Sequence, residues 1–121
     1  MAKPAYPEGD ALIPERMDEH TVVFILRAPD PPPIGDAELD ALFVQHLAYL
    51  RDLQRRGLIL ANGPLDEQTD PRFRGITIYR VPLVEALPLA TSDPMVRAGR
   101  FVIEAAHWRT PEGAARFGRH D

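Results

Sequence analysis

Two residues of this sequence are candidates for acid–base chemistry, a histidine at position 46 and an aspartate at position 93. His46 follows Leu39 by seven residues and precedes Leu50 by four, so on a helix it shares the apolar face with these leucines. A buried imidazole needs a hydrogen-bond partner, and with a suitable partner it can transfer protons. The same spacing also fits a core histidine that makes one hydrogen bond and has no catalytic role.

Asp93 has two interpretations as well. An aspartate followed by Pro94 is typical of a side chain that caps a short helix, with the proline at the first helical position. Alternatively, the carboxylate orients the imidazole of His46. Spacing alone leaves both roles open.

The neighbouring candidates are weaker. Gly63 and Pro64 are more typical of a tight turn than of a ligand cradle, because no phosphate-binding glycine pattern surrounds them. Tyr49 and Arg74 are placed to reach a pocket beside His46 and are predicted to line it. The alternatives are a packed tyrosine ring with a solvated hydroxyl and an arginine at the rim of a loop.

No metal or other cofactor is predicted. The chain has no cysteine, which excludes disulfides, thiolate nucleophiles and cysteine-ligated metals. His20, His107 and His120 fall on separate elements, and no His-x-x-x-His or HExxH spacing occurs.

The elements that must position these residues follow in the order βαββαβ. The clearest is a helix from Asp36, its expected N-cap, with leucines at three-and-four spacing and Gly57 as its left-handed terminal residue. Pro88 is expected to kink or shorten the second helix. The expected strands are His20–Arg27, Leu58–Ala61, Gly75–Val81 and Arg100–Trp108, and the second helix begins at Pro82.

This order predicts an α+β, ferredoxin-like domain, an antiparallel sheet with both helices on one face. With 121 residues and 13.5 kDa the chain is long enough for one packed domain, which we place at residues 20–109. Residues 1–19 are predicted to be an N-terminal arm and residues 110–121 a C-terminal tail. Because Val22, Phe24 and Leu26 alternate with Val23 and Ile25, both faces of the first strand are apolar, which predicts a homodimer that covers the second face.

Charge and hydropathy exclude other classes of partner. The formal net charge of −4 has the wrong sign for a protein that binds nucleic acid. Arg74-Gly-Ile-Thr-Ile-Tyr79 is similar to part of an RNA-recognition motif, but Ile76 and Ile78 stand where stacking rings are needed. The apolar runs are far below the roughly 18 residues of a membrane span. We expect a cytoplasmic protein.

Several short motifs together resemble the YCII-related family over roughly residues 20 to 113. They are His46-Leu-Ala-Tyr-Leu50, Gly57-Leu-Ile-Leu, Asn62-Gly-Pro-Leu65, Gly75-Ile-Thr-Ile, Ser92-Asp-Pro-Met-Val96, Ala98-Gly99 and His107-Trp108. The resemblance implies a dimeric α/β barrel and a His–Asp dyad in a cleft, which corresponds to His46 and Asp93, with Gly63 and Pro64 in the neighbouring loop. The departures from the family, Pro88 and the proline-rich arm, fall where they would reshape the mouth of the cleft.

Two functional hypotheses follow. In the first, the protein is a cofactor-independent enzyme of the lyase, isomerase or dehydrohalogenase type, in which His46 and Asp93 move a proton on a small cyclic or aromatic molecule. Chemistry known in the family includes dehydrochlorination of a hydroxylated aromatic ring, but the fold does not name the reaction. In the second, the protein is a non-catalytic small-molecule-binding or accessory protein that uses the same cleft.

Overall fold

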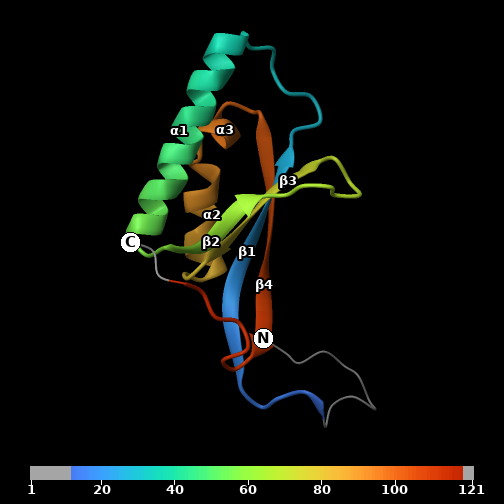
Figure 1. The fold of residues 1–121 in the computed structure, drawn as a ribbon, viewed down its shortest axis with the longest axis vertical. Helices are drawn as coiled ribbons and strands as arrows, with labels where there is room; N and C mark the ends of the chain where they lie inside the picture. Colours follow the sequence, from blue (N-terminus) through green and yellow to red (C-terminus); the bar gives the residue numbers. More distant parts are fainter. Residues whose placement is uncertain (1–11, 119–121) are drawn as a thin grey trace.

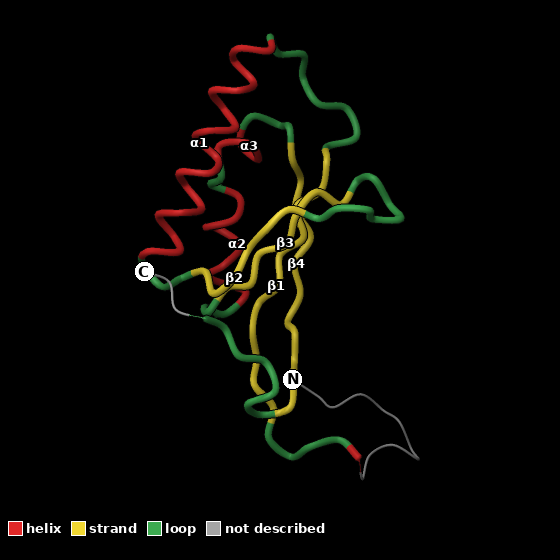
Figure 2. The backbone as a smooth tube through the Cα atoms, in the orientation of Figure 1, coloured by secondary structure: helices red, strands yellow, loops and turns green. Residues whose placement is uncertain are grey.

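The computed structural model describes residues 12–118, and within them a four-stranded antiparallel sheet is covered on one face by helices (Figure 1). Figure 2 shows the helices together on one side of the sheet. The strand order is β2-β3-β1-β4, which confirms the α+β, ferredoxin-like prediction. In chain order the elements are β1 Met17–Arg27, α1 Asp36–Arg55, β2 Ile59–Pro64, β3 Phe73–Tyr79, α2 Leu83–Thr91, α3 Pro94–Arg97 and β4 Phe101–Pro111.

The two longest strands, β1 and β4, extend further than the sequence pattern predicts. β1 starts at Met17 instead of His20, and β4 ends at Pro111 instead of Trp108, where Met17 pairs with Pro111. The added residues are mostly polar, so they lack an apolar alternation, and it is their pairing with the other strand that holds them extended. The remaining parts of the predicted arm and tail, residues 1–11 and 119–121, lie outside the described residues.

The prediction of a tight turn at Gly63 and Pro64 is wrong. β2 continues through Asn62 and Gly63 to Pro64, with Gly63 opposite Ile76 and Pro64 opposite Gly75. The strand lies at the edge of the sheet, where a proline is tolerated because one row of backbone groups has no neighbouring strand. Gly63 and Pro64 are therefore strand residues and not a tight turn.

Helix α1 ends as predicted but begins differently. The backbone N–H of Gly57 donates to the carbonyl of Gln54, and that of Leu58 to the carbonyl of Leu53. With Gly57 at φ +75° this is the paired bonding of a Schellman motif. At the other end the N-cap is Gly35, which has no side chain that could cap the helix. Asp36 is therefore the first helical residue and not the cap.

Helix α2 is not shortened at Pro88. The helix continues three residues further, to Thr91, because only the proline's own N–H is missing while its carbonyl still accepts from the backbone of Ser92. The hydroxyl of Thr91 also donates to the carbonyl of Leu87. Pro82 is the N-cap of this helix, so the helix starts one residue later than predicted.

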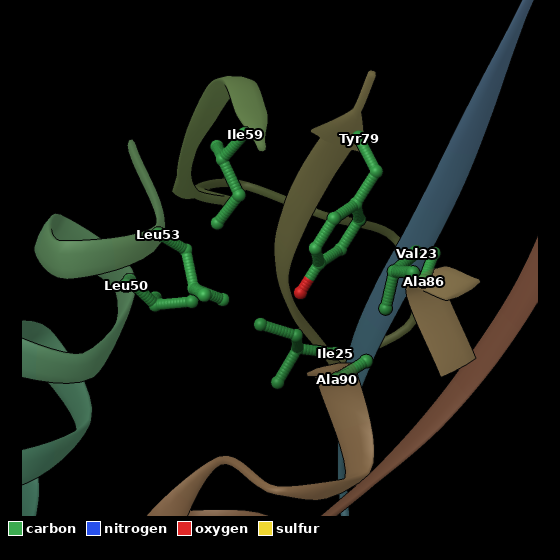
Figure 3. Close-up of a cluster of buried hydrophobic side chains, with 8 residues drawn as sticks. All are labelled: Val23, Ile25, Leu50, Leu53, Ile59, Tyr79, Ala86 and Ala90. Atoms are coloured by element: carbon green, nitrogen blue, oxygen red, sulfur yellow. The ribbon is translucent and has the colours of Figure 1, made fainter. Parts of the chain in front are cut away.

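The main core lies between the helices and the covered face of the sheet (Figure 3). Leu53 of α1 and Ile59 of β2 are 0% exposed. Ala86 and Ala90 bring α2 close to the sheet, and the Tyr79 ring lies between α2 and the α1 side of the core. The full cluster is Val23, Ile25, Leu50, Leu53, Ile59, Tyr79, Ala86 and Ala90.

The second face of the sheet carries a smaller cluster of Val22, Leu60 and Ile78. Phe117, beyond the end of β4, packs against this cluster, so part of the cover comes from the chain's own C-terminal segment. Val102 and Trp108 of β4 remain 42% and 40% exposed. None of the helices between residues 12 and 118 combines the length and apolar character needed to cross a membrane.

Candidate active site

The structure brings His46 and Asp93 together. α1 presents His46 on its inner face, where the residue is 6% exposed, and Asp93 precedes α3 and is 3% exposed. The Nδ1 atom of His46 lies 2.6 Å from Oδ2 of Asp93. A contact this short is a charge-assisted hydrogen bond when Nδ1 carries a proton and donates it to the carboxylate.

Asp93 fills both of its predicted roles at once, one with each carboxylate oxygen. Oδ1 accepts the backbone N–H of Met95 at 2.9 Å, and Pro94 occupies the first turn of α3, so Asp93 is the cap of that helix. The other oxygen, Oδ2, meets His46. Because the hydrogen bond to Met95 fixes the Asp93 side chain, the carboxylate is already oriented toward the imidazole.

Two aromatic rings pack against the imidazole. Phe43, one turn earlier on α1, has its ring centroid 5.5 Å from that of His46, and Phe101, the first residue of β4, approaches edge-on at 5.6 Å. Both separations are in the range of favourable ring contacts. These rings and the Asp93 bond together restrict the orientation of the imidazole.

A cavity of about 210 Å³ lies beside His46, between α1 and the sheet. Asp93 is not among its lining residues, so the imidazole lies between the carboxylate and the cavity. Within residues 12–118, Nδ1 is the ring nitrogen that has a hydrogen-bond partner, which leaves Nε2 for a bound molecule. Six of the residues that line this His46 cavity are Phe43, His46, Gly63, Pro64, Arg74 and Phe101.

The strand side of the cavity depends on a close approach of two backbones. A Cβ atom added to Gly75 would lie 3.2 Å from the carbonyl oxygen of Gly63, a separation tighter than most real contacts. Gly75 is also buried beneath Ile25, so a larger residue would displace β2 and change the cavity wall. The sequence pattern identifies Gly75 only as the start of a strand, because the approach of β2 to this position depends on the fold.

Of the two weaker candidates, Arg74 lines the cavity and Tyr49 does not. The Tyr49 hydroxyl donates to the carbonyl of Leu89 at 2.7 Å and so ties α1 to α2. Desolvation by burial raises the pKa of the Tyr49 hydroxyl above its ordinary value.

Sequence reasoning assigned no role in the site to Phe43 and Phe101. Phe43 was one of several apolar residues on its helix, although its position three residues before His46 is a signal that could have found it. Phe101 comes from a distant strand, so only the fold reveals its contact with His46. Between residues 12 and 118 no group of three or more histidine or acidic side chains is arranged to hold a metal ion.

The fold and the site together define a ferredoxin-like domain with a His–Asp pair beside a cavity. The family model of the YCII-related domain matches residues 21–109, and the chain belongs to this family. The predicted resemblance is therefore confirmed. No curated protein matches the chain.

Two solved structures are similar to it. One is 5-chloro-2-hydroxyhydroquinone dehydrochlorinase (TftG) from Burkholderia phenoliruptrix AC1100, in complex with 2,5-dihydroxybenzoquinone. It is 22% identical, with a TM-score of 0.52 over 74% of this chain and 92% of that chain. The other is SnoaB, a cofactor-independent oxygenase from Streptomyces nogalater, 18% identical with a TM-score of 0.44 over 82% of this chain and 99% of that chain. At this level of identity the dehydrochlorinase supports the fold.

Proposed function

We propose that this protein is a cofactor-independent enzyme of the lyase, isomerase or dehydrohalogenase type, acting on a small cyclic or aromatic molecule. The observation that carries the proposal is the 2.6 Å bond between Nδ1 of His46 and Oδ2 of Asp93, with the imidazole on the wall of a cavity. A dehydrochlorinase among the similar folds agrees with proton chemistry of this kind.

The proposed mechanism gives each residue one task. In the neutral imidazole, Nδ1–H donates to Asp93, so Nε2 carries the lone pair and removes a proton from the bound molecule. The carboxylate then stabilises the imidazolium, which returns the proton to another position or to a leaving group. General acid–base catalysis of this kind contributes about 10²–10⁴-fold to a rate.

The test is loss of turnover on removal of the imidazole. Hydroxylated aromatics and lactones are incubated with the protein in D₂O, and NMR follows deuterium incorporation or elimination. His46→Ala is expected to lower the rate by about 10²–10⁴-fold. His107→Ala is the matched control, because His107 is an exposed histidine on β4 and does not line the cavity. A His46→Ala protein that keeps the full rate contradicts the proposal.

One observation favours the second candidate, a non-catalytic small-molecule-binding protein. Asp93 caps α3 through Oδ1, so this carboxylate also has a structural role that needs no catalysis. In that case a ligand such as 2,5-dihydroxybenzoquinone binds, is recovered unchanged after long incubation, and loses affinity in His46→Ala. Recovery of a chemically altered molecule would favour the enzyme instead.

We also propose that the protein acts as a cytoplasmic homodimer that pairs through the open face of the sheet. The support is the exposure of Val102 and Trp108 beside an apolar cluster on that face. Sedimentation equilibrium of the full chain is expected to give twice the monomer mass, and Trp108→Glu to give the monomer. A wild-type monomer at all concentrations contradicts this proposal.

A further inference from the structure

A second, larger cleft adjoins the His46 cavity and is rich in arginine. The cleft has a volume of about 690 Å³ and shares Phe43, Arg74 and Phe101 with the cavity. Arg27 and Arg100 also line it, with Asp40 as the acidic residue among its lining. Three guanidinium groups against one carboxylate make this cleft cationic in a protein whose net charge is −4. We call it the arginine cleft.

The fold brings these arginines together from distant parts of the sequence. Arg27 is the last residue of β1 and pairs with Phe101, the first residue of β4. The N–H of Ala28 donates to the carbonyl of Arg100 at 3.0 Å, which holds the backbones of the two arginines close together. The end of β1 and the start of β4 lie at the same end of the sheet (Figure 1). Arg74 reaches this end from β3, where its neighbour Gly75 pairs with Ile25.

The three cleft arginines have no carboxylate partner among residues 12–118. Arg56, Arg72 and Arg109, in contrast, each form an ion pair. Arg100 donates from Nη1 to the carbonyl of Pro32 at 2.7 Å, and this neutral acceptor does not compensate its charge. Three arginines that line one cleft with a single carboxylate give it a positive potential, which favours the binding of an anion.

We propose that the arginine cleft binds the anionic group of the substrate, so that the substrate class is a cyclic or aromatic carboxylate. This inference rests on the proposed function, because it names the molecule on which His46 acts. Phe43 and Phe101 contact the imidazole and line both the cavity and the cleft, so a ligand that spans the two would place its ring near His46 and its carboxylate near the arginines. Guanidinium groups suit this carboxylate because they can bind it through two parallel hydrogen bonds.

The experiment measures affinity for two probes of the same shape and different charge. Calorimetry compares meta-hydroxybenzoate with meta-hydroxybenzamide, which replaces the carboxylate by a neutral amide. The wild-type protein is expected to bind the benzoate about tenfold more tightly, and the difference is expected to shrink as salt is added. Arg27→Gln and Arg74→Gln are each expected to remove most of this preference, because they lower affinity for the benzoate much more than affinity for the amide.

Two matched variants complete the design. Arg51→Gln removes an equal charge from an exposed position on α1 outside the cleft and is expected to keep the preference. His46→Gln removes the proposed base and is also expected to keep it, because discrimination arises at the arginines.

Three results would overturn the anion site. The wild-type protein could bind both probes equally or bind neither, or its preference for the benzoate could survive in the double variant Arg27→Gln, Arg74→Gln. These outcomes leave the proposed function intact, since deuterium exchange that depends on His46 is measured separately. A wild-type protein that shows no exchange, or exchange that His46→Ala does not lower, contradicts the proposed function; if the charge preference is retained, the anion site stands.

Discussion

The two halves of α1 face the same sheet but are packed very differently. In the C-terminal half Leu50 and Leu53 are 8% and 0% exposed and belong to the main core. In the N-terminal half Phe43 is 45% exposed, and just past the midpoint Leu47 is 50% exposed; both residues line the His46 cavity. His46 lies at the boundary between these halves. One half of the helix therefore stabilises the fold, and the other leaves apolar surface open beside the candidate base.

The largest expected effect is a difference in unfolding free energy between leucine-to-alanine variants in the two parts of α1. Leu53→Ala removes a fully buried side chain and is expected to lower the free energy of unfolding by about 2–5 kcal/mol. Leu47→Ala, the same change on the cavity side, is expected to cost less than about 1 kcal/mol because the side chain is half exposed. Urea denaturation followed by circular dichroism measures both, and equal losses would contradict the comparison.

The next effect concerns the cap at Asp93. Asp93→Ala removes the acceptor for the N–H of Met95 and the partner of His46, and is expected to cost about 1–2 kcal/mol of unfolding free energy. Asp93→Asn retains one oxygen for the cap and is expected to recover part of that loss. Thermal denaturation of the two variants checks the order. Identical melting temperatures would show that the cap contributes nothing.

The last effect is absent at neutral pH, appears only at high pH and belongs to the packed half. Burial raises the pKa of the Tyr79 hydroxyl above its ordinary value of 10.0, so Tyr79 keeps its proton in the folded state when the unfolded chain has lost it. The resulting stability is complete below pH 10 and declines above it by about 1.4 kcal/mol per pH unit. Tyr79→Phe is expected to flatten this decline in urea unfolding curves. A decline that is unchanged in the variant contradicts the assignment.

Local patterns predict the parts of the fold that are determined by neighbouring residues. The end of α1 at Gly57, the Asp93-Pro94 cap and the burial of His46 all follow from residue types within a few positions. The βαββαβ order follows from the same signals, and the order of alternating elements limits the sheet to few topologies.

The errors occur where tertiary pairing decides the outcome. β2 continues to Pro64 because the strand is at an edge, and β1 starts at Met17 because β4 lies beside it. Pro88 does not end α2, because the turn that follows the proline still forms its hydrogen bonds. The arginine cleft combines residues 27, 74 and 100, which no local spacing connects.

The central claim is that Asp93 holds His46 with Nδ1 protonated and Nε2 free toward the cavity, and ¹⁵N NMR of the His46 ring at alkaline pH tests it most directly. In Asp93→Asn the single amide oxygen is required by the Met95 cap, so the amide NH₂ faces the imidazole. The account predicts a proton on Nδ1 in the wild type and on Nε2 in Asp93→Asn. A wild-type imidazole already protonated on Nε2 would contradict it, because the nitrogen left for a bound molecule would then carry no lone pair.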